Sequence, residues 1–161
     1  MKMRGCIVVL LLLSTSGCIG LFGQESSSSA VFVGTNQGND TVTFEVFVVN
    51  SSAEYRVVIS DGRTYVDQLY GRVRTSNPGD GRHFTSVDPV ESYHSENLSV
   101  TPGNSTEISV PITAEGSALL VAVHNESGEI VTIVSLNCSR GTPELEATYY
   151  GHSAAGTSYC L

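Results

Sequence analysis

The stretch Thr41-Val-Thr-Phe-Glu-Val-Phe-Val-Val49 places an apolar residue at every second position from Val42 to Val48. The residues between them are Thr41, Thr43, Glu45, Phe47 and Val49. Successive side chains of a β-strand point to opposite faces of a sheet. The stretch therefore predicts a strand whose Val42 face packs on a hydrophobic core.

The rest of the chain beyond residue 30 shows the same period of two and no sustained period of 3.6. The turn Asn125-Glu-Ser-Gly128 separates the two most apolar segments and is typical of a hairpin. The predicted strands are 30–34, 41–49, 54–60, 64–70, a piece around Phe84, 106–113, 117–123, 129–136 and 143–150. The predicted inward side chains are Tyr55, Val57, Ile59, Ile108, Val110, Ile112, Leu145, Ala147 and Tyr149. About 7–9 short strands at this spacing favour an all-β sandwich.

Two segments resemble the immunoglobulin-like surface domains of bacteria and archaea. Thr43-Phe-Glu-Val-Phe-Val-Val-Asn-Ser-Ser52 resembles their strand closed by an Asn, and Leu98-Ser-Val-Thr-Pro-Gly-Asn-Ser-Thr-Glu-Ile-Ser-Val110 resembles their Pro-Gly turn between edge strands. The resemblance covers about residues 30–138 and implies an immunoglobulin-like β-sandwich domain over residues 30–161. It implies a fold and no activity. The chain has no Trp, so the core Trp of antibody domains is absent.

The first eighteen residues resemble the export signal of a lipoprotein. Lys2 and Arg4 precede a short apolar run, which suits a signal peptide and is too short to span a bilayer. The run leads to Thr15-Ser-Gly-Cys18, which resembles a lipobox with Thr in place of the usual Leu. The resemblance implies a signal peptide over 1–17 and a membrane lipid attached to Cys18 on the extracytoplasmic face of the cell membrane. The alternative is an ordinary secretory signal with an incidental Cys.

Residues 18–29 are rich in Gly and Ser and are typical of a flexible tether. The chain has a formal net charge of −8, which becomes −10 once Lys2 and Arg4 leave with the signal. A chain this acidic, with six Arg and no Lys after residue 17, is a poor binder of nucleic acid. The excess of Asp and Glu resembles the proteins of extremely halophilic archaea, where molar salt screens acidic repulsion.

The cysteines that remain after Cys6 leaves and Cys18 is lipidated are Cys138 and Cys160. An even pair in an exported domain predicts a disulfide. A redox or metal pair would need the close C-x-x-C spacing, which this pair lacks.

Asn-x-Ser/Thr sequons occur at six of the eight asparagines, more than composition predicts, and indicate an exported glycoprotein. The glycosylation candidates are Asn39, Asn50, Asn97, Asn104 and Asn125. The sixth sequon, at Asn137, is the weakest because Cys138 follows it.

Residues 61–96 show the weakest strand pattern, and the turn-forming hexapeptide Ser76-Asn-Pro-Gly-Asp-Gly81 divides them. Four of the six mature arginines gather in this region among aromatic residues, and Arg and Tyr are common in recognition surfaces. The candidate binding-surface residues are Arg63, Tyr65, Tyr70, Arg72, Arg74 and Arg82. The alternative is that these arginines simply pair with the acidic surface.

Catalytic and metal motifs are not evident. Asp88, Glu91 and His94 recur every three residues, but a neighbouring proline favours a solvent-exposed loop over a metal site. His124 begins a hairpin turn and is expected to be exposed. A blue-copper site needs a Cys with a following His and Met, and both methionines lie in the signal. The hydrolase, metalloprotease and phosphate-loop signatures are also missing.

The sequence therefore predicts a lipid-anchored, non-catalytic module at the cell surface, with a binding or structural role and no cofactor. A partner in another surface or membrane protein fits this prediction. The alternative is a lipoprotein that binds a small molecule or metal through the 61–96 region.

Overall fold

The computed structural model describes residues 28–76, 81–112 and 116–161. Twelve strands and no helix occur in these ranges, and they form two sheets that pack as a β-sandwich. The all-β sandwich predicted from the sequence is confirmed. No helix in the described ranges is long and apolar enough to cross a membrane. The predicted signal peptide, Cys18 and the tether up to residue 27 lie outside the described residues.

The smaller sheet has four strands in the order β12-β11-β1-β8. Its members are β1 (Ser29–Asn36), β8 (Ser105–Pro111), β11 (Pro143–Tyr149) and β12 (Ala154–Cys160). β1 runs parallel to β11 and antiparallel to β8. Pro111 ends an edge strand, where its missing N–H breaks no ladder bond.

The larger sheet has eight strands, and five of them form its central part in the order β5-β10-β9-β2-β7. These are β2 (Val42–Asn50), β5 (Arg72–Thr75), β7 (Ser92–Val100), β9 (Ser117–His124) and β10 (Ile130–Asn137). The first hydrophobic core fills the space between this part and the smaller sheet. It contains the predicted inward faces of 41–49 and 143–149, namely Val42, Phe44, Val46, Val48, Leu145, Ala147 and Tyr149.

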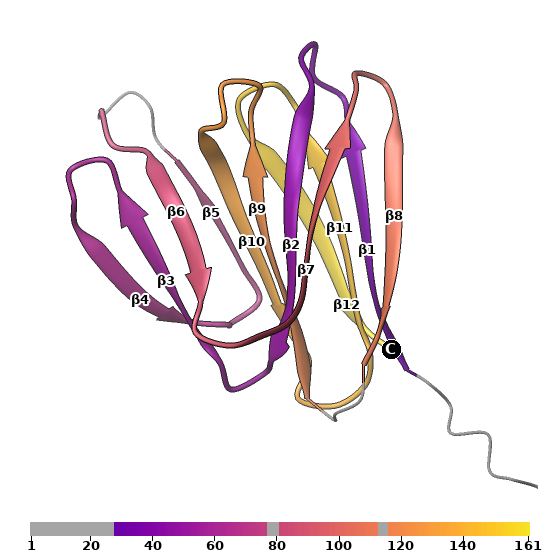
Figure 1. Ribbon diagram of the computed structural model, residues 1–161. Helices are drawn as coiled ribbons and strands as arrows, with labels where there is room; N and C mark the ends of the chain where they lie inside the picture. The colour runs from indigo at the N-terminus through magenta and orange to yellow at the C-terminus, as the bar shows by residue number, and fades with distance from the viewer. Residues whose placement is uncertain (1–27, 77–80, 113–115) are drawn as a thin grey trace, which may run out of the picture.

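The other three strands are β4 (Thr64–Gln68), β3 (Glu54–Ile59) and β6 (Phe84–Pro89), hydrogen-bonded in that order. One residue pair, Phe84 with Ile130, joins β6 to β10. Figure 1 shows these strands as a separate group beside β5 and β10, and we call this group the β3 layer. Tyr55 and Val57 of the β3 layer pack on Phe47 and other side chains from the second face of the central part, forming a second core.

The second core explains residues that alternation alone leaves unexplained. Phe47 and Val49 lie opposite the Val42 face of β2, yet they are 7% and 0% exposed because the β3 layer covers them. β9 is buried on both faces for the same reason, which accounts for its unbroken apolar sequence. The predicted inward residues Tyr55, Val57 and Ile59 are indeed buried, and Tyr55 and Val57 belong to this second core.

The strands outnumber the 7–9 expected from the sequence because polar edge strands lack an apolar alternation. The prediction of a loop over 88–94 was wrong: Asp88 belongs to β6 and His94 to β7. β7 is an edge strand held by its backbone ladder with β2, so most of its side chains are exposed and its sequence is polar. The short strand β5 is exposed throughout and was also missed.

The strands run between two ends of the sandwich (Figure 1). We call the end at which β1 begins the proximal end; the C-terminus lies there too, paired through Leu161 and Thr142. We call the opposite end the distal end. It carries the described turns 37–41, 60–63, 101–104, 125–129 and 150–153.

Candidate functional site

A hollow of about 280 Å³ opens between the β3 layer and β5. Its apolar wall is made by Val57, Ile59 and Phe84. The polar lining is Tyr65, Asp67, Arg74, Thr75, Ser76 and Arg82. We call it the arginine hollow. Three of the six residues predicted as a binding surface, Tyr65, Arg74 and Arg82, meet here although they are spread over 18 positions of the sequence.

The register of the strands places Arg74 and Asp67 opposite one another across the gap. Arg74 pairs with Ile133 of β10, so its side chain leaves the central part on the side of the β3 layer. Asp67 pairs with Tyr55 on β3, and the guanidinium of Arg74 forms an ion pair with its carboxylate. The Tyr55 phenol also donates to Asp67, at 3.3 Å. Burial, and then the Asp67 charge, raise the pKa of Tyr55.

A second cationic group, formed by Arg63 and Arg82 around Asp61, adjoins the arginine hollow through Arg82. Arg63 donates to Asp61 through Nε at 2.8 Å and through a terminal nitrogen at 2.6 Å, and these bonds lower the pKa of Asp61. Arg82 lies 3.5 Å from the same carboxylate. Arg63 donates two short hydrogen bonds to Asp61, whereas Arg82 makes one longer contact with it. Of the two guanidinium groups, Arg82 is therefore the one held less tightly by Asp61. Its side chain is 59% exposed and lines the arginine hollow.

Tyr70 and Arg72 lie apart from this group. Arg72 stacks over the Tyr70 ring, with its central carbon 5.4 Å from the ring centroid. Both line a different, shallower depression with Leu69, Asn137 and Ser139. Of the six predicted residues, Tyr65, Arg74 and Arg82 therefore line the arginine hollow, Tyr70 and Arg72 line the other depression, and Arg63 lines neither.

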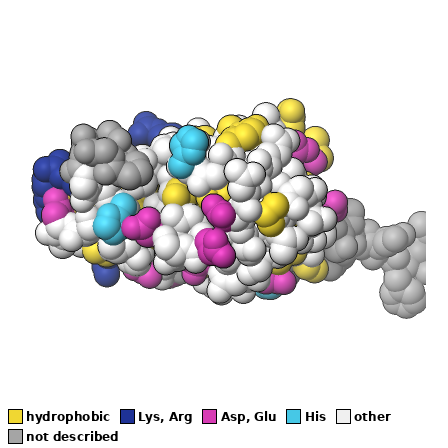
Figure 2. Space-filling model, turned by 90° about the horizontal axis from the view of Figure 1, so that it is seen from above, with side chains coloured by type: hydrophobic (Ala, Val, Ile, Leu, Met, Phe, Trp, Pro, Cys, Tyr) yellow, Lys and Arg dark blue, Asp and Glu magenta, His cyan; other side chains and the backbone are white. Residues whose placement is uncertain are grey.

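The distal end shows how charge is distributed over the molecule. Figure 2 looks onto this end, and the arginine side chains seen there gather at its left, over the β3 layer, while most of the carboxylates lie in the middle and at the right. A negatively charged partner that approaches this end would be attracted to its left part.

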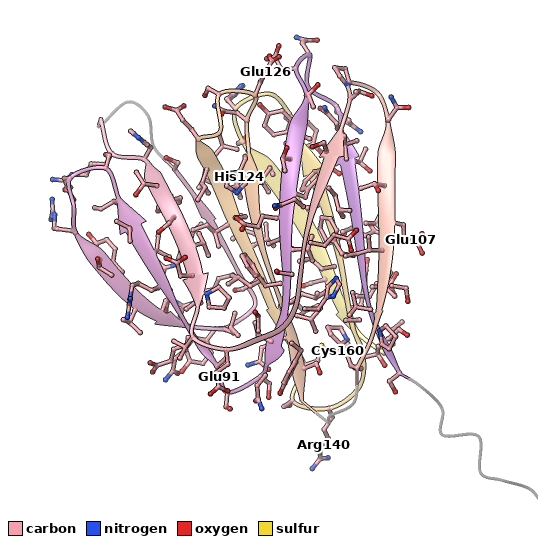
Figure 3. The ribbon with its side chains drawn as sticks, viewed as in Figure 1. Glu91, Glu107, His124, Glu126, Arg140 and Cys160 are labelled. Atoms are coloured by element: carbon pink, nitrogen blue, oxygen red, sulfur yellow. A yellow bond between two sulfur atoms is a disulfide. The ribbon has the colours of Figure 1, made fainter. Side chains whose placement is uncertain are left out.

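Sequence reasoning missed a second hollow, which we call the threonine hollow. It measures about 440 Å³ and is lined by Thr41, Thr43, Glu45, Asn97, His124, Asn125, Glu126 and Gly128. His124, labelled in Figure 3, was expected to be exposed, but its side chain is only 21% exposed. Its Nε2 lies 3.0 Å from the Glu45 carboxylate. Its Nδ1 lies 3.3 Å from the Gly128 carbonyl oxygen. Glu45 interrupts an otherwise uncharged strand, which was the available signal.

Among the described residues, one further histidine ring contacts a carboxylate. His94 lies 3.3 Å from the Glu96 carboxylate on the same strand. Among the residues that the structure describes, no three His, Cys, Asp or Glu side chains come close enough to hold a metal ion. Asp88, Glu91 and His94 are accordingly not brought together there.

The predicted disulfide between Cys138 and Cys160 is present. It connects the end of β12 to the residue after β10 at the proximal end, where Figure 3 labels Cys160. The sequons Asn39, Asn104 and Asn125 lie in distal turns, Asn97 lies in β7, and Asn50 ends β2 at the proximal end.

No family model matches this chain, and no curated protein matches it. One solved structure, named "Trapped Toxin", is similar to this chain with a TM-score of 0.37 and 10% identity. The similarity covers 83% of this chain and 23% of that chain.

Proposed function

We propose that this chain is a non-catalytic recognition module held on the extracytoplasmic face of the cell membrane by a lipid on Cys18. In this proposal the arginine hollow binds a group of another surface or membrane protein that joins a carboxylate to an aliphatic or aromatic body. The observation that carries the proposal is the meeting of three apolar side chains, Tyr65 and two arginines in one hollow.

The composition of the arginine hollow supports this class of ligand. Val57, Ile59 and Phe84 offer an apolar wall, which favours an apolar body. Among the described residues, Arg82 forms one ion pair, the 3.5 Å contact between its Nε and Asp61, which involves neither terminal nitrogen of its guanidinium. In protein interfaces, the residues that contribute most to binding are often arginines and aromatic residues in pockets that exclude water. The arginine hollow offers both kinds of residue.

Titration with anilinonaphthalene sulfonate, a fluorescent anion with an aromatic body, tests the hollow directly. The dye should bind the folded protein, and Arg82→Gln should weaken its binding about tenfold, the loss expected for one charged hydrogen bond. Arg140→Gln is the matched control, because Arg140 lies in the turn between β10 and β11, away from the hollow (Figure 3). Equal affinities for all three proteins would refute the hollow as an anion site.

Crosslinking separates a protein partner from a small molecule. A photoreactive phenylalanine analogue at position 65 in native membranes should give an adduct that runs as a larger protein, and the same analogue at exposed Tyr159 should not. An adduct of small mass would instead favour the small-molecule alternative in the 61–96 region, which this hollow overlaps.

The anchor is tested by cell fractionation and mass. The wild-type protein should remain with membranes and carry a lipid on Cys18, whereas Cys18→Ser should release an exported, soluble protein. A mass that begins at Met1 in the native host would refute export.

A further inference from the structure

The six sequons differ in what their side-chain amides do in the folded domain. The amides of Asn39 and Asn97 are exposed and form no hydrogen bond with the described residues. Asn39 lies in the distal turn before β2, and Asn97 lies on edge strand β7, which pairs only with β2. A large substituent on either nitrogen would therefore extend into solvent and displace no contact of the fold.

The other four side-chain amides take part in hydrogen bonds of the fold. The Asn104 nitrogen donates to Thr101 Oγ1 at 2.8 Å, and the Asn125 nitrogen donates to the Glu129 carboxylate at 3.2 Å. The Asn137 nitrogen donates to the Ser51 carbonyl oxygen at 2.6 Å and is half-buried. In Asn50 it is the oxygen that is engaged, because it accepts bonds from the Ser52 backbone and hydroxyl.

Asn97 also has space beside it. It pairs with Glu45 across the ladder, so both side chains lie on the same face and border the threonine hollow. This hollow of about 440 Å³ is lined by polar side chains, including Thr43 and His124. The first sugar of a glycan on Asn97 would find hydrogen-bonding partners there in place of an apolar surface.

We infer that Asn39 and Asn97 carry N-linked glycans in the exported protein and that Asn137 does not. In the transfer, the Asn side-chain nitrogen forms a bond to the anomeric carbon of an oligosaccharide and gives up one proton. The bond from that carbon to the phosphate oxygen of a lipid-linked donor breaks, and the lipid phosphate leaves with the electron pair. The donor is a lipid phosphate-linked oligosaccharide of the exporting membrane.

The glycans would leave the arginine hollow uncovered. No sequon occurs between residues 51 and 96, which include the whole β3 layer and β5. This inference rests on the export part of the proposed function and is independent of what the arginine hollow binds.

The test is the intact mass of the full chain purified from membranes of its own host, with the variants Asn39→Gln, Asn97→Gln and Asn137→Gln. The first two should each lose the mass of one glycan, and Asn137→Gln should lose none. Thr41→Ala should lose the Asn39 glycan, whereas Thr41→Ser, which keeps the sequon hydroxyl, should retain it. Because both Thr41 variants keep Asn39, a loss of mass in Thr41→Ala alone shows that the modification requires the sequon hydroxyl.

Three outcomes would overturn the inference. They are a wild-type protein without glycans, glycans on Asn104 or Asn125 in place of Asn39 and Asn97, and a glycan on Asn137. The same spectrum shows the lipid on Cys18 and the disulfide. A lipidated, oxidised and sugar-free protein would therefore refute the glycans while leaving export intact.

Discussion

Asn36 is fully buried at the distal end of β1, and its side chain connects three segments. Its amide nitrogen donates to the carbonyl oxygens of Asp40 and Val100, each at 2.8 Å, and its amide oxygen accepts from the Gly38 backbone at 2.9 Å. The turn after β1 and the end of β7 are thereby held to one residue. Asn36 is not part of a sequon, and its value is structural.

We expect Asn36→Asp to destabilise the domain by roughly 2–4 kcal/mol at pH 7, because a carboxylate faces two carbonyl oxygens that it cannot satisfy. Denaturant unfolding measures this loss, which should shrink as pH falls and the carboxyl gains a proton. Gln37→Glu adds the same charge at an exposed neighbour and should change the free energy of unfolding little. Similar losses for the two variants would contradict the role of the buried amide.

Tyr55 gives a prediction at high pH. Its pKa is raised above 10.0, first by burial and then by the Asp67 carboxylate. The folded protein holds this proton more tightly than the unfolded chain, so the free energy of unfolding falls as pH rises above 10. Tyr55→Phe should reduce this fall. Tyr65→Phe, which removes a half-exposed phenol from the neighbouring strand, is the control for the loss of a hydroxyl group.

The pairing of β1 with its neighbours depends on a small residue in the first core. A Cβ at Gly34 would lie 2.8 Å from two carbons of the Phe44 ring, which itself packs on Phe32. We expect Gly34→Ala to cost about 1–3 kcal/mol through overpacking. Gly71→Ala is the matched control, because the nearest atom would be 3.9 Å away, and it should be neutral. Thermal melts of both variants measure the difference.

The disulfide fastens edge strand β12, most of which is exposed. Its 22-residue separation predicts a stabilisation of about 3 kcal/mol from the loop-entropy model. The double variant Cys138→Ser and Cys160→Ser should lose this amount in denaturant unfolding. Reductant should destabilise the wild-type protein and have no effect on the variant; an effect on both would point to another cause.

Most strands with apolar side chains could be predicted from the sequence, including the edge strands β4 and β8, whereas the polar strands β5, β7 and β12 could not. Alternation identified β2 and β11 because the Val42 face of β2 and the Leu145 face of β11 pack on the first core. β5 and β7 are held mainly by backbone hydrogen bonds, which leave no pattern in side chains. Phe47 and Val49 are apolar residues on the second face of β2. Only the structure shows that the β3 layer covers them.

The candidate site could be predicted only in part for a related reason. Arg74 and Arg82 are close in sequence to Tyr70 and Arg72, but the strand direction carries the two sets to different depressions. Glu45 and His124 are 79 residues apart, and only the β2–β9 ladder brings them together. Local patterns report residue types, whereas the sheet register decides which of them meet.

Acidic side chains also set how the whole domain responds to salt. Glu107 of β8, labelled in Figure 3, and Glu146 of β11 both lie opposite Val33 of β1, on the outer face of the smaller sheet. β1 separates the two strands, so these like charges repel across two strand spacings, about 10 Å. The Debye length falls from about 10 Å at 0.1 M salt to about 3 Å at 1 M, which screens this repulsion.

We therefore expect the melting temperature to rise by several degrees between low and molar sodium chloride. Glu107→Gln combined with Glu146→Gln should be more stable than the wild-type protein at low salt and less dependent on added salt. If the melting temperatures of both proteins rise equally with salt, the rise comes from stronger apolar burial and not from screening of these two charges.

The central position of β1 has a mechanical consequence. β1 is hydrogen-bonded on both sides, parallel to β11 and antiparallel to β8. A pull on the chain at residue 28 acts along the strand axis and loads both ladders in shear, so their bonds resist together. An edge strand pulled sideways would instead unzip one bond at a time. If the domain is anchored at its proximal end and bound at its distal end, a pulling force should separate other strands before β1 leaves the sheet.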